Sequence, residues 1–227
     1  MSLSYSIQRA SSPLGTPDLT NDTLWAHASQ APVTHFSWKD SGHRPDARGH
    51  LLYDDDWLAV RFTVQDQYVR AVAEKFNDSV CSDSCVEFFV APNDDPAQSA
   101  YFNFEVNCGG TMLLFACPSP AQRNAGADVV HVSEEDGSTI QMAATLPKIV
   151  EPELTDPTLW AVEYHVPWAL FEKYFDVERP QPGQTWRGNF YKCGDRTSHP
   201  HWGSWSPVDT PSPSFHQPDF YQPLRFA

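Results

Sequence analysis

Two consecutive strand-like segments between residues 83 and 110 limit the fold more than any other part of the chain. The stretch reads DSCVEFFVAPNDDPAQSAYFNFEVNCGG. Alternate positions form one apolar row in each segment: Val86, Phe88 and Val90, then Phe102, Phe104 and Val106. Because successive side chains of a strand point to opposite faces, this spacing predicts a β-hairpin with one face in a core.

The opposite face of this predicted hairpin is polar. It carries Glu87, Asn103, Glu105 and Asn107. A solvated sheet face is usually built from lysine, glutamate and threonine, whereas carboxylates and amides together can bind several hydroxyl groups. We therefore interpret this row as a candidate ligand-binding face.

Further alternating segments predict an all-β fold. They lie at residues 49–66, 111–118, 158–167 and 184–195, and 20 prolines and 13% aromatic residues accompany them. One short helix is expected at residues 167–175, because proline is tolerated in a first helical turn. We expect a two-sheet antiparallel β-sandwich with long loops, formed as a single domain of residues 1–227, in which residues 1–24 are a lead-in that packs on the body.

Charge and composition argue against several classes of partner. The formal charge is −14 with only 15 lysines and arginines, so we expect neither nucleic acid nor an anionic membrane as partner. The sequence has no basic segment followed by an apolar one at its start, which predicts a cytoplasmic protein. Five cysteines, an odd number, are expected to be reduced thiols. The oligomeric state is not predicted.

Metal and cofactor signals are weak. Three turn residues, Asp54, Asp55 and Asp56, are calcium candidates, although acidic turn residues are more often solvated. A zinc site at Cys81 and Cys85 lacks a second cysteine pair. We expect that no cofactor is required and that calcium is possible.

Saccharide binding has the most positive evidence. Sugars expose C–H patches and hydroxyls, so their sites combine aromatic rings with planar polar side chains. The aromatic loop HPHWGSWSPV at residues 199–208 carries Trp202 and Trp205, although either tryptophan could instead cover a core edge. The predicted ligand-binding residues are Glu87, Asn103, Glu105, Asn107, Trp205, Tyr68, Arg123 and His201.

Six segments in order resemble the family 9 carbohydrate-binding modules. They are DSCVEFFVAP, YFNFEVNCGG, PWALF, RGNFYKCGD, PHWGSWSPVDTPSPSFHQP and FYQPLRF, and the similarity runs from about Trp25 to the C-terminus. The resemblance is closest to the stand-alone proteins of this type. It implies a β-sandwich related to DOMON domains, a glycan end held between two tryptophans, and structural calcium ions.

The resemblance also implies roles for individual residues. It implies that Glu87 and Asn107 bind sugar hydroxyls and that Trp205 is the second clamp tryptophan. Two positions depart from the family pattern. Cys81 stands at the position of the first clamp tryptophan, and Glu105 replaces an arginine, which reverses a charge and removes hydrogen-bond donors.

Three alternative functions remain open from the sequence. The first is a sugar-active hydrolase that uses Glu87 and Glu105 as paired carboxyl groups. The second, implied by the DOMON relationship, is a haem protein with ligands from His201 or His216 and from Met112 or Met142. The third is a protein-interaction module that uses the same polar face.

Overall fold

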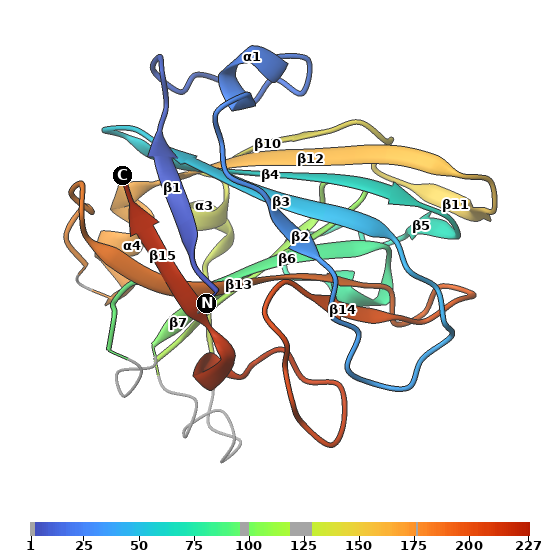
Figure 1. Cartoon of the computed structure of the whole chain (residues 1–227). Coiled ribbons are helices and arrows are strands. Elements are labelled where there is room, and N and C mark those ends of the chain that lie inside the picture. The colour runs from blue at the N-terminus through green and yellow to red at the C-terminus, as the bar shows by residue number, and fades with distance from the viewer. Residues whose placement is uncertain (1–2, 96–99, 119–128, 176) are drawn as a thin grey trace.

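The computed structural model describes residues 3–95, 100–118, 129–175 and 177–227 and shows a mostly β fold (Figure 1). The strands are β1 (Tyr5–Arg9), β2 (Ala31–Val33), β3 (Asp46–Tyr53), β4 (Trp57–Asp66), β5 (Val69–Ala71), β6 (Cys85–Ala91), β7 (Tyr101–Asn107), β8 (Met112–Cys117), β9 (Val130–His131), β10 (Gln141–Ala144), β11 (Val150–Leu154), β12 (Thr158–Pro167), β13 (Thr185–Cys193), β14 (Trp202–Ser204) and β15 (Gln222–Phe226).

One large sheet contains almost all of these strands. Its order is β10-β12-β4-β3-β1-β15-β13-β6-β7-β8-β9, with β2 paired to β3 and β14 paired to β13, while β5 and β11 form a separate pair. The N-terminal strand β1 pairs in parallel with both β3 and β15. The sheet is therefore mixed, and the expectation of a purely antiparallel arrangement is wrong at this point.

The lead-in expected at residues 1–24 contributes a strand to the middle of this sheet. Ile7 on β1 is fully buried, and Leu14 is 5% exposed. Figure 1 shows β1 beside β15, so the first and last strands of the chain lie side by side where one half of the sheet continues into the other. A strand of five residues in a polar stretch is too short to give a clear periodic signal. Its hydrogen-bond partners are strands far away in sequence, which local periodicity does not reveal.

The sheet curls so that its two halves face each other across the main core. Figure 1 shows β3, β4, β12 and β10 lying across β13, β6 and β7. Aromatic rings meet between the halves: the Phe62 and Phe190 centroids are 6.0 Å apart, as are those of Phe104 and Tyr164. The predicted sandwich is thus partly confirmed, as two facing halves of one continuous sheet.

The central hairpin is confirmed. Strands β6 and β7 pair antiparallel, with Glu87 opposite Glu105 and Phe88 opposite Phe104. The apolar row of each strand is buried in the main core, as the alternation predicts.

The predicted helix is also present, as α4 (Trp168–Phe175), and Phe171 on it is buried. The expectation of a single helix is incomplete. The described residues also form α1 (Asp22–Trp25), α3 (Glu134–Gly137) and two 3₁₀ turns, η1 (Val80–Ser82) and η2 (Pro218–Phe220). Ser133 caps α3 by accepting a hydrogen bond from the Asp136 amide. A search of the described residues finds no helix with the length and apolar character that crossing a membrane requires.

A buried histidine on β3 is expected to make the fold sensitive to acid. His50 is 9% exposed, and burial together with the charges of Arg61 and Arg48 lowers its pKa to about 4. In the unfolded chain a histidine titrates near pH 6.5, so the unfolded state binds a proton first as the pH falls. His50 therefore contributes stability above this pH, and that contribution is lost as the pH falls towards 4.

We expect His50 to account for a loss of about 2 kcal/mol in unfolding free energy between pH 7 and pH 5. Urea denaturation at both pH values, on the wild type and on His50→Gln, measures this loss. The other titratable groups are the same in both proteins, so the quantity to compare is the difference between the two losses. Equal losses in the two proteins would contradict the assignment.

Candidate functional site

A cavity of about 300 Å³ lies on the outer face of the central hairpin, away from the main core. Its lining residues are Cys81, Glu87, Glu105, Cys193, Asp195, Trp202, Pro213, Ser214, Phe215 and His216. Strands β6, β7 and β13 supply the floor, and the walls come from η1, from β14 and from the segments that follow β13 and β14. Residues distant in sequence meet here because β13 pairs with β6.

Much of the predicted polar face is covered rather than open. A second apolar cluster packs on it, including Phe89 and Tyr101 of the hairpin, Tyr191 of β13, and Phe215 and Tyr221 from the C-terminal segment. Phe215 stacks on Tyr191 with ring centroids 4.1 Å apart. The cavity is thus the part of this face that the C-terminal segment leaves uncovered.

Two carboxylates form the centre of the cavity floor. Glu87 and Glu105 lie on one face of the hairpin, as the sequence predicts. They are directly opposite each other on β6 and β7 and are only 3% and 5% exposed. Glu87 Oε1 accepts a hydrogen bond from Cys193 Sγ at 3.1 Å, and Glu105 Oε1 accepts one from Asn103 Nδ2 at 2.8 Å. Carboxylate oxygens accept more than one hydrogen bond, so both groups can also bind hydroxyls of a ligand.

Trp202 provides an aromatic wall beside these carboxylates. Its indole Nε1 donates to Asp195 Oδ1 at 2.7 Å, which fixes the orientation of the ring. His216 forms another part of the wall, and a hydrogen bond of 2.9 Å between its Nδ1 and the Tyr101 hydroxyl fixes its position. The cavity therefore combines an aromatic surface with oriented polar groups.

Sequence reasoning missed several lining residues. Asp195 and Cys193 lie in the segment RGNFYKCGD, and His216 follows in PSPSFHQP, both of which belong to the family resemblance. These two segments of the resemblance were the signal in the sequence from which the lining residues could have been predicted. Their position over Glu87 depends on the β13 and β6 pairing, which local periodicity does not reveal.

The structure does not support the prediction that Trp205 is an aromatic platform. Its side chain is 4% exposed and packs in the main core, edge-on to Tyr5 at 6.2 Å and Phe190 at 5.6 Å between ring centroids. The Trp205 amide donates to the Phe190 carbonyl at 2.8 Å, just beyond the end of β14. The tryptophan that lines the cavity is Trp202.

Asn103 supports the site from below, whereas Asn107 stabilises a turn. Asn103 is buried and orients Glu105. Asn107 Nδ2 donates to Asp83 at 2.8 Å, and its Oδ1 accepts from the amides of Gly109 and Thr111. Since these bonds engage both ends of the amide, and the cavity lining does not include Asn107, a direct ligand contact is not supported.

Replacing Asn107 tests this structural role. We expect Asn107→Ala to lower the unfolding free energy by about 1–3 kcal/mol, because the buried Asp83 carboxylate and two amides lose a partner. Chemical denaturation measures the loss. The affinity of the folded variant for ligands of the cavity should be unchanged, and lost binding with normal stability would restore Asn107 to the site.

Tyr68 and His201 lie in a separate cluster. Tyr68 stacks on His199 with ring centroids 3.6 Å apart, and His201 Nε2 lies 2.9 Å from Lys192 Nζ. Burial, followed by the Lys192 charge, lowers the pKa of His201 to about 3. Neither Tyr68 nor His201 lines the cavity over Glu87. Arg123, the remaining predicted residue, lies outside the described residues.

The calcium candidates do not offer a converging set of oxygens. Asp54 Oδ1 accepts from the amides of Asp56 and Trp57, and its Oδ2 accepts from the amide of Leu14 at 2.7 Å. Asp55 forms an ion pair with Arg9 at 2.6 Å. These carboxylates organise the turn and the lead-in. Within the described residues, three metal-ligating side chains converge elsewhere, at Cys85, Glu87 and Cys193.

The haem alternative is not supported by the placement of its ligands. His216 lines the cavity over Glu87, whereas Met112 and Met142 line a different cavity of about 200 Å³. His201 is hydrogen-bonded within its own buried cluster. Neither cavity combines a candidate histidine with a candidate methionine.

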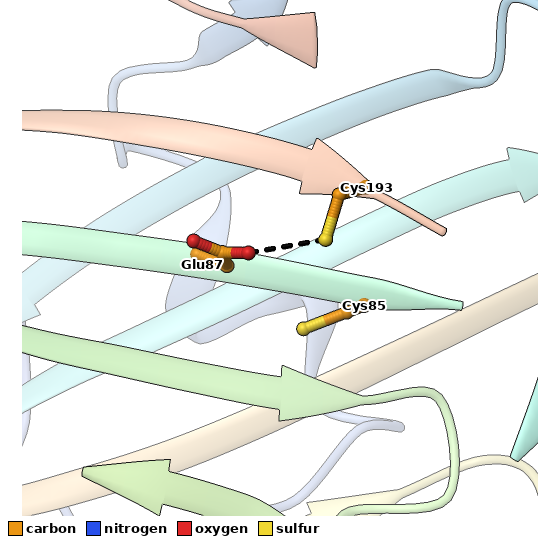
Figure 2. Close-up of side chains that lie close together, drawn as sticks. All are labelled: Cys85, Glu87 and Cys193. Atoms are coloured by element: carbon orange, nitrogen blue, oxygen red, sulfur yellow. Dashed lines mark hydrogen bonds between the residues drawn. The ribbon is translucent and has the colours of Figure 1, made fainter. Parts of the chain in front are cut away.

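Two thiols lie beside Glu87, as Figure 2 shows. Cys85 on β6 is directly opposite Cys193 on β13, and both thiols are free and buried. Burial raises the pKa of Cys85, while the contact with Cys85, and then burial, raises that of Cys193. The two sulfurs and a Glu87 oxygen all lie within 4.8 Å of one another.

These features define a mostly β protein with a small polar cavity, walled by a tryptophan, on one sheet face. The chain belongs to carbohydrate-binding family 9, whose sequence model matches residues 20–226. A search of curated proteins found no match.

Solved structures share this fold. A candidate carbohydrate-binding protein from Bacteroides uniformis is 28% identical, with a TM-score of 0.82 and coverage of 99% of each chain. A family 9 carbohydrate-binding module from Caldicellulosiruptor kristjanssonii in complex with cellotriose is 13% identical, with a TM-score of 0.64, 99% of this chain covered and 93% of that one. The same type of module from this organism in complex with glucose is 13% identical, with a TM-score of 0.61 and coverage of 98% and 95%.

Proposed function

We propose that this chain is a non-catalytic carbohydrate-binding protein that holds a saccharide in the cavity over Glu87 and Glu105. One observation carries the proposal: paired carboxylates on the floor and Trp202 on the wall of one cavity, in a chain of carbohydrate-binding family 9. The cavity volume of about 300 Å³ is at the lower end of small-molecule sites. This size favours the end of a glycan over a long internal segment.

The chemistry of the lining suits a sugar. Sugar hydroxyls can donate to Glu87 and Glu105 and can exchange hydrogen bonds with Ser214 and His216. The C–H face of a pyranose ring can pack on Trp202, an amphipathic side chain whose own N–H is already bonded to Asp195. No step of this binding requires a cofactor.

Glucose and short β-glucans are the first ligands to test. The two related modules of known structure were solved with cellotriose and with glucose. At 13% identity these modules support a comparison of the fold alone. The lining residues of this chain determine its own ligand preference. Two carboxylates favour ligands that offer hydroxyl or other hydrogen-bond donors, and a formal charge of −14 disfavours acidic glycans.

The hydrolase alternative is less well supported. Glu87 and Glu105 are cross-strand neighbours, so both side chains project from one sheet face and approach a ligand from the same side. Glycosidases instead place their two carboxyl groups on either side of the bond that breaks. We expect no reducing-sugar release from a panel of polysaccharides. Release that disappears in Glu87→Gln would establish the enzyme.

Calorimetric titration of the purified chain with glucose, cellobiose, cellotriose and a panel of other saccharides tests the proposal. We expect at least one of them to bind with a Kd of about 1 mM or lower, which corresponds to a favourable binding free energy of roughly 4 kcal/mol or more. A chelator in one series removes any contribution from metal ions. If no saccharide binds at millimolar concentration in either series, the proposal fails, and the cavity would then be assigned to a protein partner or another ligand.

A further inference from the structure

We infer that Cys85, Glu87 and Cys193 form a binding site for a thiophilic divalent cation such as Zn²⁺. One ligand atom from each residue lies within 4.8 Å of the other two, and all three side chains are buried. Two of these residues, Glu87 and Cys193, line the cavity and give an ion access from outside. This inference does not rest on saccharide binding.

Strand geometry explains why the three groups converge. Cys85 and Glu87 are two residues apart on β6, so both side chains point to the same face. Cys193 is opposite Cys85 on β13, and its sulfur already lies 3.1 Å from Glu87 Oε1 (Figure 2). The ligand atoms are thus fixed by paired strands rather than by flexible loops.

The distances suit a tetrahedral ion after small side-chain rotations. Zinc bonds of about 2.0–2.3 Å place neighbouring tetrahedral ligands roughly 3.3–3.8 Å apart. Cys193 Sγ and Glu87 Oε1, at 3.1 Å, are already near this spacing, and no pair of ligand atoms is more than 4.8 Å apart, so a pair has to approach by at most about 1.5 Å. Three protein ligands leave a fourth position, which a water molecule from the cavity can occupy.

The electrostatics of the cavity also favour a cation. Among the residues that the structure describes, its lining contains three carboxylates, from Glu87, Glu105 and Asp195, and neither lysine nor arginine. A divalent ion between Glu87 and the two sulfurs would reduce the repulsion between Glu87 and Glu105. On binding, both thiols lose their protons to solvent and become thiolates. Sulfur ligands select zinc and similar soft ions over calcium or magnesium.

Metal titration of the reduced, chelator-stripped full chain tests this site. Co²⁺ serves as the spectroscopic probe, because thiolate ligation produces a sulfur-to-metal charge-transfer band, and calorimetry with Zn²⁺ alone gives affinity and stoichiometry. We expect one Zn²⁺ per chain and a thiolate band with Co²⁺. The variants Cys193→Ser and Glu87→Gln should each weaken Zn²⁺ binding by about 100-fold or more. Removing a residue that only supports a metal ligand costs about 10- to 100-fold in affinity, and removing a ligand itself should cost at least as much.

Cys108→Ser is the matched control, because Cys108 is another buried free thiol that does not line the cavity. Its affinity for Zn²⁺ should equal that of the wild type. Circular dichroism checks that each variant is folded, and Glu87→Gln keeps the test valid if Cys193→Ser does not fold.

Three results would overturn the inference: no thiolate band, Zn²⁺ affinity unchanged in both site variants, or an equal loss in Cys108→Ser. A disulfide between Cys85 and Cys193 that persists in reductant and prevents metal binding, detected by mass spectrometry, would also overturn it. Saccharide titrations of the metal-free chain are separate, so failure of this site and failure of the proposed function can be distinguished.

Discussion

Trp202→Ala is expected to weaken saccharide binding by about 10- to 100-fold, because the cavity loses its aromatic wall. Stacking of an aromatic ring contributes about 0.5–1.5 kcal/mol beyond the area it buries. The apolar surface that the sugar buries against the ring adds to this contribution. Each 1.4 kcal/mol of lost binding free energy raises the Kd about tenfold. Asp195 also loses the indole N–H as a partner and gains freedom to bind water instead. Calorimetry with the tightest saccharide of the panel measures the change.

The matched control for this experiment is Trp57→Ala. Trp57 is likewise partly exposed, but it packs beside Leu14 and Leu52, away from the cavity. Its replacement should leave saccharide affinity unchanged. Equal affinities in wild type and Trp202→Ala would show that the ligand binds elsewhere, and an equal loss in Trp57→Ala would indicate a general effect on the fold.

Trp205→Ala should instead reduce stability, by about 3–5 kcal/mol, because a large side chain is removed from a closed core. Trp205 is 4% exposed and contacts Tyr5 of β1 and Phe190 of β13, so it joins the two strands that flank β15. Urea denaturation measures the loss. Once folded, this variant should keep the affinity of the wild type for saccharide.

These two tryptophans, three residues apart, therefore have opposite expected effects. Trp202→Ala should change affinity with a small effect on stability, and Trp205→Ala should do the reverse. The opposite outcome, in which Trp205→Ala abolishes binding while the protein keeps its stability, would restore the role that the sequence implied for Trp205.

The hairpin was predictable because strand periodicity is a local property. Alternation from Val86 to Val90 and from Phe102 to Val106 assigned both faces correctly, and placed Glu87 and Glu105 on one side. The turn at Asn107 was less predictable. Its amide bonds to Asp83 and to the turn amides, and such a local role is not distinguishable by residue type from a ligand contact.

The remainder of the site depends on contacts between distant segments. His216 reaches the cavity because the C-terminal segment folds back over β6, β7 and β13, and β1 enters the sheet by parallel pairing at both edges. Neither arrangement leaves a periodic signal in the sequence. The aromatic loop was recognised from the sequence. Strand periodicity ends at Ser204, where β14 ends, so the sequence pattern did not show which of Trp202 and Trp205 lines the cavity and which is in the core.

Two departures from the family pattern are located in the cavity itself. Cys81 and Glu105 both line it, at positions where the family resemblance implies a tryptophan and an arginine. Trp202 is thus the one tryptophan among the lining residues that the structure describes, and the floor carries more negative charge than the family pattern implies. We expect the ligand preference to differ from that of a module with an aromatic clamp.

Nuclear magnetic resonance of the tryptophan side chains tests the central claim most directly. The chain has 8 tryptophans, each with one indole N–H signal that can be assigned by single substitutions. On titration with the tightest saccharide, the signal of Trp202 should move in proportion to occupancy, because its N–H lies at the cavity wall beside Asp195. The signal of the core residue Trp205 should move little. A saccharide that binds while the Trp202 signal stays in place would contradict the assignment of this cavity as the saccharide site.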